Sequence, residues 1–252
     1  MVRSDALKRR YIIAFSISIV FMFAFYSVSH SYEMYENKGR RYYEQTGEVV
    51  WEIKTAEKII AITFDDGPDA NYTARVLDLL AEYEAKATFF IIGKNAESHP
   101  ELVLRQYEEG HEIANHTYTH PWTTSVDRLD KELKQTNEII FSITGFYPTL
   151  FRPVGGQYTD AMIDTAVKNG FQVVMWSWHQ DTEDWANPGV QKIVDTVLTG
   201  TKPGNVILFH DSGGDRRQTL EALEKILPEL KKQGYQFLTI SELLEYQRKN
   251  VH

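Results

Sequence analysis

The chain has 252 residues, enough for one well-buried domain and a short extension, and its composition of 42% hydrophobic and 25% charged residues is typical of globular proteins. A formal net charge of −8 argues against nucleic acid as a partner, because the basic surface that binds phosphates is missing. The chain contains no cysteine, which excludes disulfides and thiolate metal ligands. Any metal site must therefore use histidine and carboxylate side chains.

The N-terminal part of the chain has the pattern of a membrane anchor. Tyr11 to Val28 is a run without charge that would span about 27 Å as a helix, close to the thickness of a bilayer core. Basic residues from Arg3 to Arg10 precede it, which favours a cytoplasmic N-terminus with the remainder of the chain outside. The alternatives are a signal peptide cleaved before His30 and a buried soluble helix.

This pattern divides the chain into four expected parts. They are a basic cytoplasmic tip at 1–10, a transmembrane signal-anchor at 11–28, a stalk at 29–47 and a globular domain at 48–248. The stretch from His30 to Gly47 is polar and aromatic and lacks a long period, so we interpret it as a stalk or as a lead-in packed on the domain surface.

Strand-like and helix-like patterns alternate along the globular domain. The expected strands are Val49 to Ile53, Ile59 to Phe64, Ala87 to Ile92, His111 to Ala114, Leu150 to Phe151, Phe171 to Trp176, Val206 to Phe209 and Phe237 to Thr239. The expected helices are Ala74 to Tyr83, Pro100 to Glu109, Val126 to Ser142, Thr159 to Asn169, Val190 to Leu198 and Arg217 to Gln233. This alternation predicts a parallel sheet with helices outside, open or closed into a barrel.

Polar residues follow several of these strands. They are Asp65-Asp66, Asn115-His116, Arg152, the Asp181 to Trp185 stretch and His210-Asp211. In an α/β barrel the functional groups collect at the carboxyl ends of the strands, where the loops converge. The positions therefore predict a barrel enzyme.

Two short patterns predict a metal site in that enzyme. His116 and His120 are four residues apart, so on a helical turn they would share one face and one cation. A carboxylate from a neighbouring loop completes a two-histidine, one-carboxylate set with open positions for water and substrate. The Asp65-Asp66 doublet suits hydrolysis, because one carboxylate can hold the metal while the other takes a proton from water. Each pattern alone is weak, since Asp-Asp-Gly-Pro most often marks a turn.

Five motifs in order resemble those of the polysaccharide deacetylases of carbohydrate esterase family 4, the NodB-homology group. The match runs from about Glu48 to Tyr246, and its motifs stand at Thr63 to Pro68, His116 to His120, Arg152 to Gly156, Asp181 to Trp185 and Leu208 to His210. The resemblance implies an α/β fold, a distorted (β/α) barrel with about seven parallel strands, which here follows the N-terminal transmembrane helix.

The resemblance also implies which residues carry the reaction. Asp66, His116 and His120 are expected to bind a divalent metal, Asp65 to act as the base, and His210 to protonate the leaving amine. Zn²⁺ suits this ligand set, and Co²⁺, Ni²⁺ or Mn²⁺ could occupy it.

Two further residues are expected to support the base and the acid. Arg152 is expected to lie against Asp65 and keep it ionised, and Asp184 to orient His210 and raise its pKa.

Side chains around the acetyl group complete the expected site. Trp185 and Leu208 are expected to form an apolar wall against the acetyl methyl. Gly155 stands where the family usually has an aromatic residue, so its N–H can still meet an oxyanion but part of the wall is lost. The loop from Trp178 to Gln180 is about two residues longer than common versions and is a candidate sugar platform; core packing is the alternative, favoured for Trp176.

The expected function is removal of N-acetyl groups from N-acetylglucosamine residues of a cell-wall peptidoglycan or chitin-like glycan, with release of acetate. The alternatives are O-deacetylation of acetylxylan and a barrel that binds glycans without turnover. The expected partners are the glycan polymer and a bacterial cell membrane, with the catalytic domain extracellular, or secreted if the N-terminal segment is cleaved. A monomer is expected.

Overall fold

The computed structural model describes residues 38–250. The expected tip and anchor, and the stalk up to residue 37, lie outside these residues. Within the part that the structure describes, no helix is long and apolar enough to cross a membrane. One compact unit begins at Arg40, earlier than the expected domain start at residue 48.

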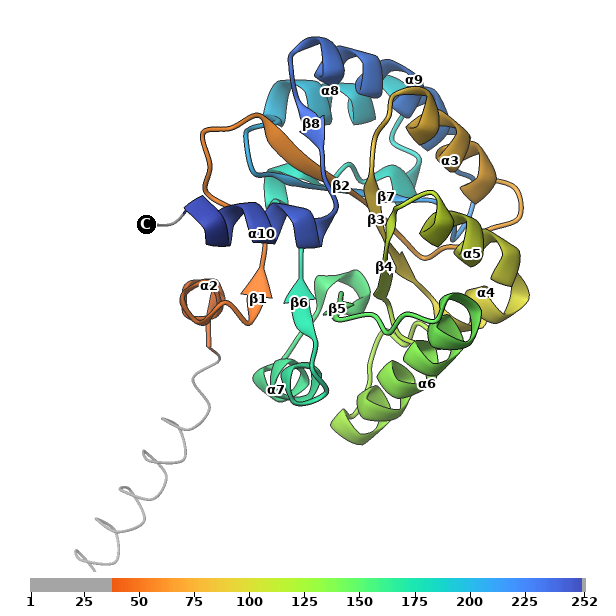
Figure 1. Ribbon diagram of the computed structural model, residues 1–252, viewed down its shortest axis with the longest axis vertical. Coiled ribbons are helices and arrows are strands. Elements are labelled where there is room, and N and C mark those ends of the chain that lie inside the picture. Colours follow the sequence, from red (N-terminus) through yellow and green to blue (C-terminus); the bar gives the residue numbers. More distant parts are fainter. Residues whose placement is uncertain (1–37, 251–252) are drawn as a thin grey trace, which may run out of the picture. The chain divides into compact units, whose positions relative to one another are not determined.

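The centre of this unit is a parallel sheet, and seven of its strands follow the order β1-β6-β5-β4-β3-β2-β7 (Figure 1). The strands on this path are β1 Val49–Val50, β2 Ile59–Asp65, β3 Ala87–Ile91, β4 Glu112–Asn115, β5 Leu150–Phe151, β6 Gln172–Val174 and β7 Val206–His210. A further strand, β8 Gln236–Phe237, pairs with the beginning of β2. The prediction of about seven parallel strands is confirmed.

The barrel is incomplete between β1 and β7, the two ends of this path. There, an isolated bridge joins Glu52 to Asn205, and the N–H of Ser177 donates to the carbonyl of Val206 at 3.0 Å. The sheet therefore curves round without a continuous ladder at its seam, which is the expected distortion.

Strand β2 shows how the interior is built. All seven of its residues are buried, as expected for a parallel strand covered on both faces. Because side chains alternate, Ile59, Ala61, Thr63 and Asp65 share one face. Ile59 and Ala61 belong to an apolar cluster, whereas Thr63 and Asp65 are polar, so the interior changes from apolar to polar along the strand.

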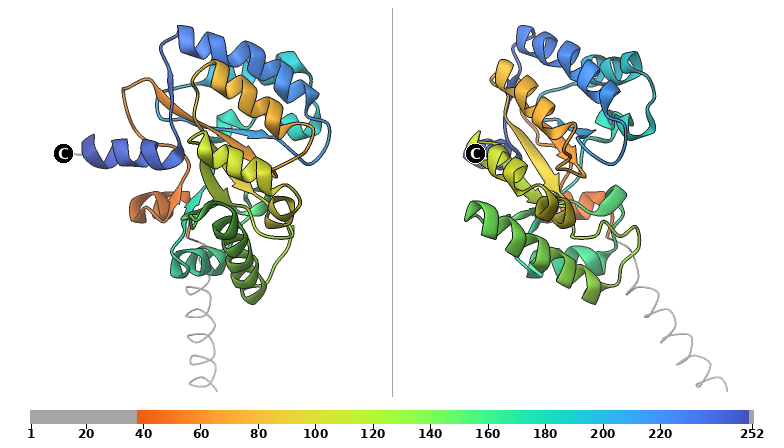
Figure 2. Two further views of the ribbon diagram at one scale, coloured as in Figure 1. Left: turned by 45° about the vertical axis from the view of Figure 1, so that its right-hand side comes forward. Right: turned by 90° about the vertical axis from the view of Figure 1, so that its right-hand side faces the viewer.

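Helices cover the outside of the sheet (Figures 1 and 2). They are α2 Arg40–Thr46, α3 Thr73–Glu82, α4 Gly93–Ser98, α5 Pro100–Glu108, α6 Val126–Thr144, α7 Asp160–Lys168, α8 Val190–Gly200, α9 Arg217–Lys232 and α10 Ile240–Asn250. Three short 3₁₀ turns, η1 Val154–Gly156, η2 Trp178–Gln180 and η3 Asp184–Ala186, lie in the connecting loops. Local capping explains two helix starts: Ser125 accepts from the Arg128 N–H, and Thr159 accepts from the Met162 N–H.

Three of these helices were not predicted. Helix α4 is short, with six residues. Helix α10 packs Ile240, Leu243 and Leu244 into the apolar cluster that contains Ile59 and Ala61. Helix α10 therefore closes the apolar end of the barrel interior, opposite the polar end.

Helix α2 occupies part of the segment interpreted as a stalk. Its Tyr43 is fully buried, and the Tyr43 hydroxyl donates to Asp160 Oδ1 at 2.6 Å. Arg40–Thr46 is therefore a lead-in packed on the domain rather than part of a stalk.

Candidate active site

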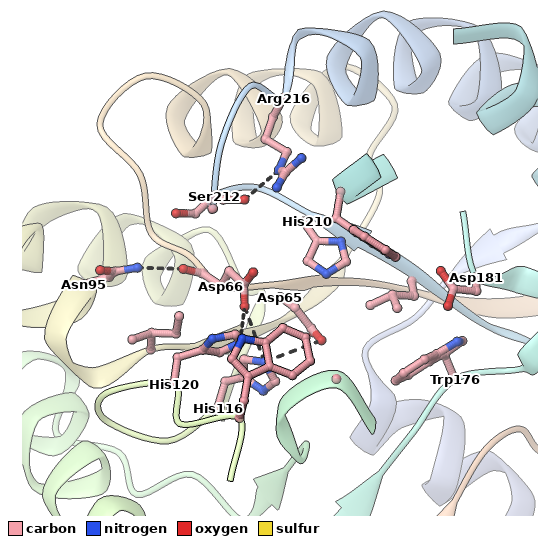
Figure 3. Close-up of a pocket in the computed structure, with 16 residues that line it drawn as sticks. Asp65, Asp66, Asn95, His116, His120, Trp176, Asp181, His210, Ser212 and Arg216 are labelled. Atoms are coloured by element: carbon pink, nitrogen blue, oxygen red, sulfur yellow. Dashed lines mark hydrogen bonds and ion pairs between the residues drawn. The ribbon is translucent and has the colours of Figure 1, made fainter. Parts of the chain in front are cut away.

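The polar motifs meet in one cavity of about 610 Å³ at the polar end of the barrel (Figure 3). Asp65 is the last residue of β2 and His210 the last of β7, while His116 follows β4 directly. Cavities of this size are typical of small-ligand sites. The strand ends therefore place these side chains together as the sequence predicted.

A backbone reversal lets both members of the carboxylate doublet face the cavity. In a continuing strand Asp65 and Asp66 would point to opposite faces, but Asp66 has a φ of 74°, in the left-handed region. A hydrogen bond from α4 stabilises this backbone conformation, because Asn95 Nδ2 donates to the Asp66 carbonyl at 2.7 Å. A Cβ on Gly67 would lie 2.4 Å from Asp211 Oδ1, so a glycine is required where the turn packs on Asp211.

The side chains of Asp66, His116 and His120 converge on one point. Asp66 Oδ1 lies 3.4 Å from His116 Nε2 and 3.1 Å from His120 Nε2. These separations match ligand atoms that each lie about 2.1 Å from one shared ion. Burial opposes ionisation of Asp66, but hydrogen bonds and charge from the two imidazoles, when these are protonated, outweigh burial and hold its pKa well below the usual range.

The second nitrogen of His116 supports the same interpretation. His116 Nδ1 lies 2.8 Å from the carbonyl of Arg152, which can only accept, so Nδ1 carries a proton. In the neutral ring Nε2 then has a free lone pair directed at Asp66 Oδ1, a buried oxygen without a hydrogen-bond partner. Two facing lone pairs are stabilised by a cation between them, and metal-binding histidines commonly donate their other N–H to a carbonyl. The residues fit a divalent metal.

The two histidines do not lie on a helical turn, and that prediction was wrong. They belong to a loop in which Thr117 and His120 have positive φ values of 69° and 55°. Glu132 of α6 holds this loop, because its carboxylate accepts the N–H groups of Tyr118 and Thr119 at 2.9 and 2.6 Å. Glu132 was not identified from the sequence, since nothing local distinguishes it from other charged residues of α6.

Arg152 lies against Asp65, as expected. Its Nη1 donates to Asp65 Oδ1 at 2.7 Å and to Thr63 Oγ1 at 2.9 Å, and the guanidinium is fully buried. Its remaining nitrogens donate to the carbonyls of Val174 and Met175. Asp65 Oδ2 does not contact Arg152 and lies 3.9 Å from His116 Nε2, on the side of the three converging side chains.

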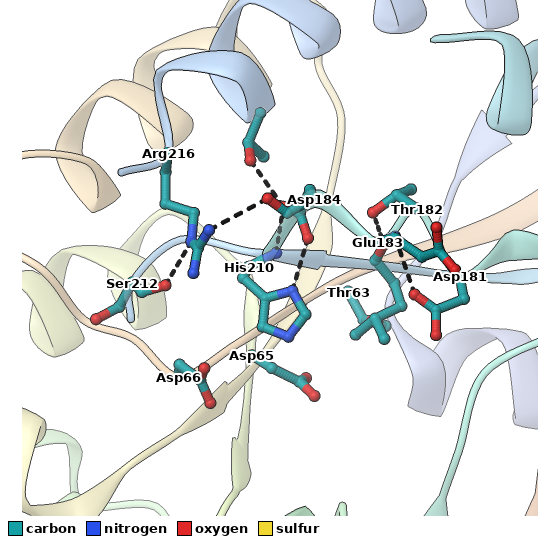
Figure 4. A network of polar contacts seen from close by, with 12 residues as sticks. Thr63, Asp65, Asp66, Asp181, Thr182, Glu183, Asp184, His210, Ser212 and Arg216 are labelled. Atoms are coloured by element: carbon teal, nitrogen blue, oxygen red, sulfur yellow. Dashed lines mark hydrogen bonds and ion pairs between the residues drawn. The ribbon is translucent and has the colours of Figure 1, made fainter. Parts of the chain in front are cut away.

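Asp184 contacts His210, also as expected (Figure 4). His210 Nδ1 donates to Asp184 Oδ1 at 2.7 Å, while Asp184 Oδ2 accepts from the His210 N–H and from the hydroxyl of Thr219. Burial alone would lower the pKa of His210, but the charge of Asp184 outweighs burial and raises that pKa to about 9. Arg216 donates to the Asp184 carbonyl at 3.2 Å and holds η3 in place. Thr219 and Arg216 were not identified from the sequence.

The wall of the cavity differs from the expectation at Gly155. Trp185 and Leu208 line the cavity as predicted, and Trp185 is 58% exposed. Trp122 occupies the space that a side chain at position 155 would need, because a Cβ on Gly155 would lie 2.6 Å from Cζ3 of the Trp122 ring. An aromatic ring from Trp122 therefore lies where a side chain at Gly155 would have been, and it lines the same cavity. Trp122 also meets His120 edge to face, with 5.9 Å between the rings.

The two tryptophans of the longer loop have different surroundings. Trp176 packs partly against the core and also lines the cavity. Trp178 is 64% exposed, so core packing is excluded for it, and the guanidinium of Arg40 lies 5.1 Å from its ring.

Known proteins are similar to this chain in sequence and in fold. The family model described as polysaccharide deacetylase matches residues 52–174. A peptidoglycan-N-acetylglucosamine deacetylase of Bacillus cereus is 53% identical over 209 residues, which cover 82% of this chain and 98% of that protein. The chain belongs to the polysaccharide deacetylase family.

Two other relatives extend the comparison. A chitooligosaccharide deacetylase of Rhizobium leguminosarum bv. trifolii is 37% identical to this polysaccharide deacetylase over 76% of the chain and 94% of the relative. The crystal structure of the Bc1960 peptidoglycan N-acetylglucosamine deacetylase superposes with a TM-score of 0.76 at 36% identity, covering 80% of this chain and 94% of that one.

The contact between Asp184 and His210 predicts a pH dependence for this deacetylase. If protonated His210 is required, activity is present below the pKa of His210 and is lost as the pH rises through it. Asp184→Asn keeps the hydrogen bond but removes the charge, so we expect the alkaline limb of kcat/KM to move about 1 to 3 pH units lower. A cation bound nearby lowers the pKa of His210 in the wild type and in Asp184→Asn alike, so the test compares the pH profiles of these two proteins. An unchanged alkaline limb would show that His210 does not set it.

Proposed function

We propose that this polysaccharide deacetylase removes N-acetyl groups from N-acetylglucosamine residues of peptidoglycan, or of a closely related glycan, and releases acetate. The observation that carries the proposal is the joint presence, in one cavity, of three converging side chains that could hold a metal, a carboxylate paired with a buried arginine and a histidine paired with a buried aspartate. Metal-dependent amide hydrolysis uses an electrophile, a base and an acid, and these residues could supply all three.

Asp66, His116 and His120 would hold the metal, with Zn²⁺ the preferred ion and Co²⁺, Ni²⁺ or Mn²⁺ as alternatives. A divalent cation bound there would polarise the acetyl carbonyl and lower the pKa of the attacking water.

The protein's own groups would then move the protons. Asp65 Oδ2 is free of Arg152 and takes the proton of the water as its oxygen bonds to the acetyl carbon. His210 has its Nδ1 held by Asp184, so its Nε2–H gives a proton to the glucosamine nitrogen as the C–N bond breaks. The amine therefore leaves neutral, and the acetic acid that remains ionises to acetate. The N–H of Gly155 faces the developing oxyanion in this proposal, with Trp185 and Leu208 around the methyl group.

The acid favours N-acetyl over O-acetyl substrates. An amine is a poor leaving group unless it is protonated, whereas an ester cleaves more easily, so a buried Asp184–His210 pair is more useful for an amide. The similar proteins named above act, by their names, on peptidoglycan or chitooligosaccharides, and both contain N-acetylglucosamine. Acetylxylan remains the alternative substrate.

Acetate release from N-acetylglucosamine oligomers, peptidoglycan and acetylxylan tests the proposal directly. We expect release from the N-acetylated glycans, its loss on treatment with a chelator and its recovery when Zn²⁺ is added. His120→Ala should lose both bound metal and activity, whereas His99→Ala, at a histidine away from the cavity, should keep both. Release that survives complete removal of metal would contradict the metal-dependent reaction, and release from acetylxylan alone would replace the proposed substrate.

We also propose that the enzyme is anchored in a bacterial membrane with its catalytic domain outside. The charge-free run from Tyr11 to Val28, with basic residues before it, supports this topology. Protease added to intact protoplasts that express the full chain should remove the catalytic domain. Protection from the protease, with digestion only after lysis, would reverse the topology and with it the choice of a wall glycan.

A further inference from the structure

Arg216 is a buried arginine without a carboxylate partner. The structure buries two arginines, and the other, Arg152, is paired with Asp65. Arg216 is only 2% exposed, yet it forms no ion pair within residues 38–250. Its Nε and Nη1 donate to backbone carbonyls alone, those of Ser212, Asp184 and Asp215. Because a buried charge is costly unless it is paired, Arg216 has a place for an anion that the described chain does not fill.

The remaining nitrogen of Arg216, Nη2, is open to the active-site cavity. It makes no hydrogen bond within residues 38–250, but it is not sealed from solvent. Arg216, Gly213 and Asp66 all line the cavity of about 610 Å³. A Cβ on Gly213 would lie 3.4 Å from Arg216 Nη2 and 3.0 Å from Asp66 Oδ2, so these two atoms border the same space. In Figure 4 the guanidinium nitrogen without a dashed line is the one turned toward Asp66 and His210.

The loop before α9 leaves Nη2 uncovered. Gly213 and Gly214 have φ values of 79° and 142°, in the region that favours glycine. A Cβ on Gly214 would lie 3.6 Å from Nη2, in contact with the guanidinium. Two successive glycines therefore keep side chains of this loop away from the free nitrogen.

The free N–H groups suit a carboxylate better than a neutral group. Hydrogen bonds between arginine and a carboxylate are charge-assisted and about twice as strong as neutral ones. Asp66 Oδ2 borders the same space and would oppose an anion there. However, Asp66 Oδ1 faces the two histidines of the proposed metal site, so a bound divalent cation would offset the charge of Asp66.

We propose that Arg216 binds a carboxylate group that enters the active-site cavity beside the proposed metal ligands. Two sources share this chemistry. One is the acetate that the reaction releases, and the other is a carboxylate of the glycan, which peptidoglycan carries on its muramyl and peptide parts and chitooligosaccharides lack. The inference rests on the proposed function, because both sources belong to that reaction.

Binding of acetate tests the first source without turnover. Acetate is titrated into the zinc-loaded full chain and into Arg216→Gln, which removes the charge, with acetamide as the neutral control ligand. We expect Arg216→Gln to bind acetate about tenfold more weakly and acetamide equally well, since a hydrogen bond to a charged group is lost. Arg216→Lys, which keeps the charge, should retain part of the affinity. Arg217→Gln, at the exposed arginine that pairs with Asp215, is the matched control and should bind like the wild type.

The KM for two matched disaccharides tests the second source. Both contain N-acetylglucosamine and N-acetylmuramic acid, and in one of them the lactyl carboxylate is converted to its methylamide. We expect the wild type to have a KM about 10- to 100-fold lower for the free carboxylate, and Arg216→Gln to lose this preference. The loss of hydrogen bonds to the Ser212 and Asp184 carbonyls would lower kcat on both disaccharides alike, so the ratio of the two KM values isolates the charge.

The two arms identify the source of the carboxylate. Weaker acetate binding alone assigns the released acetate, and a lost KM preference alone assigns the glycan. Equal losses for charged and neutral ligands, or no change in either arm, would overturn the site. Weaker zinc binding by Arg216→Gln with unchanged carboxylate preference would also overturn it, because Arg216 would then serve Asp66.

The wild type provides a test that does not depend on how well a variant folds. Equal affinity for acetate and acetamide, together with equal KM for the two disaccharides, would overturn the carboxylate site. Acetate release from both disaccharides would still support the proposed function in that case. If the wild type releases acetate from neither disaccharide, release from peptidoglycan decides the proposed function, and the acetate titration decides the site.

Discussion

The buried contact between Arg152 and Asp65 is the interaction on which the geometry of the site depends. Arg152 joins three parts of the barrel: its guanidinium binds Asp65 and Thr63 of β2 and the carbonyls of Val174 and Met175 at the end of β6. Its own carbonyl accepts from His116, which fixes the ring of a proposed metal ligand. Removing one partner of such a buried pair typically costs about 3–5 kcal/mol, because the other charge is left uncompensated. Because desolvation of both charges offsets much of their mutual attraction, the pair is better explained by the orientation that it imposes than by a net gain in stability.

That orientation separates two adjacent carboxylates into different roles. Asp65 has one oxygen bound to Arg152, so its other oxygen is directed into the cavity. Asp66 is turned by its positive φ toward His116 and His120. His210 is held on the other side by Asp184, which Thr219 and Arg216 hold in turn. Asp65 and His210 are therefore each positioned by a buried partner, Arg152 and Asp184.

The sequence predicted the features that follow from local pattern. Buried parallel strands give continuous apolar runs such as Ile59–Asp65, and polar residues after the strands marked one rim of the barrel. It could not predict features that depend on contacts between distant segments. The loop from His116 to His120 is shaped by Glu132 of α6, and α10 is stabilised by the apolar end of the barrel rather than by a strong pattern of its own. Gly155 showed from the sequence that a side chain was missing, but only the structure shows that Trp122 fills the space.

The division of roles between Asp65 and Asp66 is tested most directly by zinc titration and acetate release on Asp65→Asn and Asp66→Asn, with unfolding curves to confirm that both variants fold. We expect Asp65→Asn to bind zinc like the wild type and to lose turnover by about a hundredfold or more, as for a positioned general base. Asp66→Asn should instead weaken zinc binding by about a hundredfold or more, since even an outer partner of a ligand contributes about 10- to 100-fold. Normal turnover by Asp65→Asn, or loss of zinc from Asp65→Asn with normal binding by Asp66→Asn, would contradict the account.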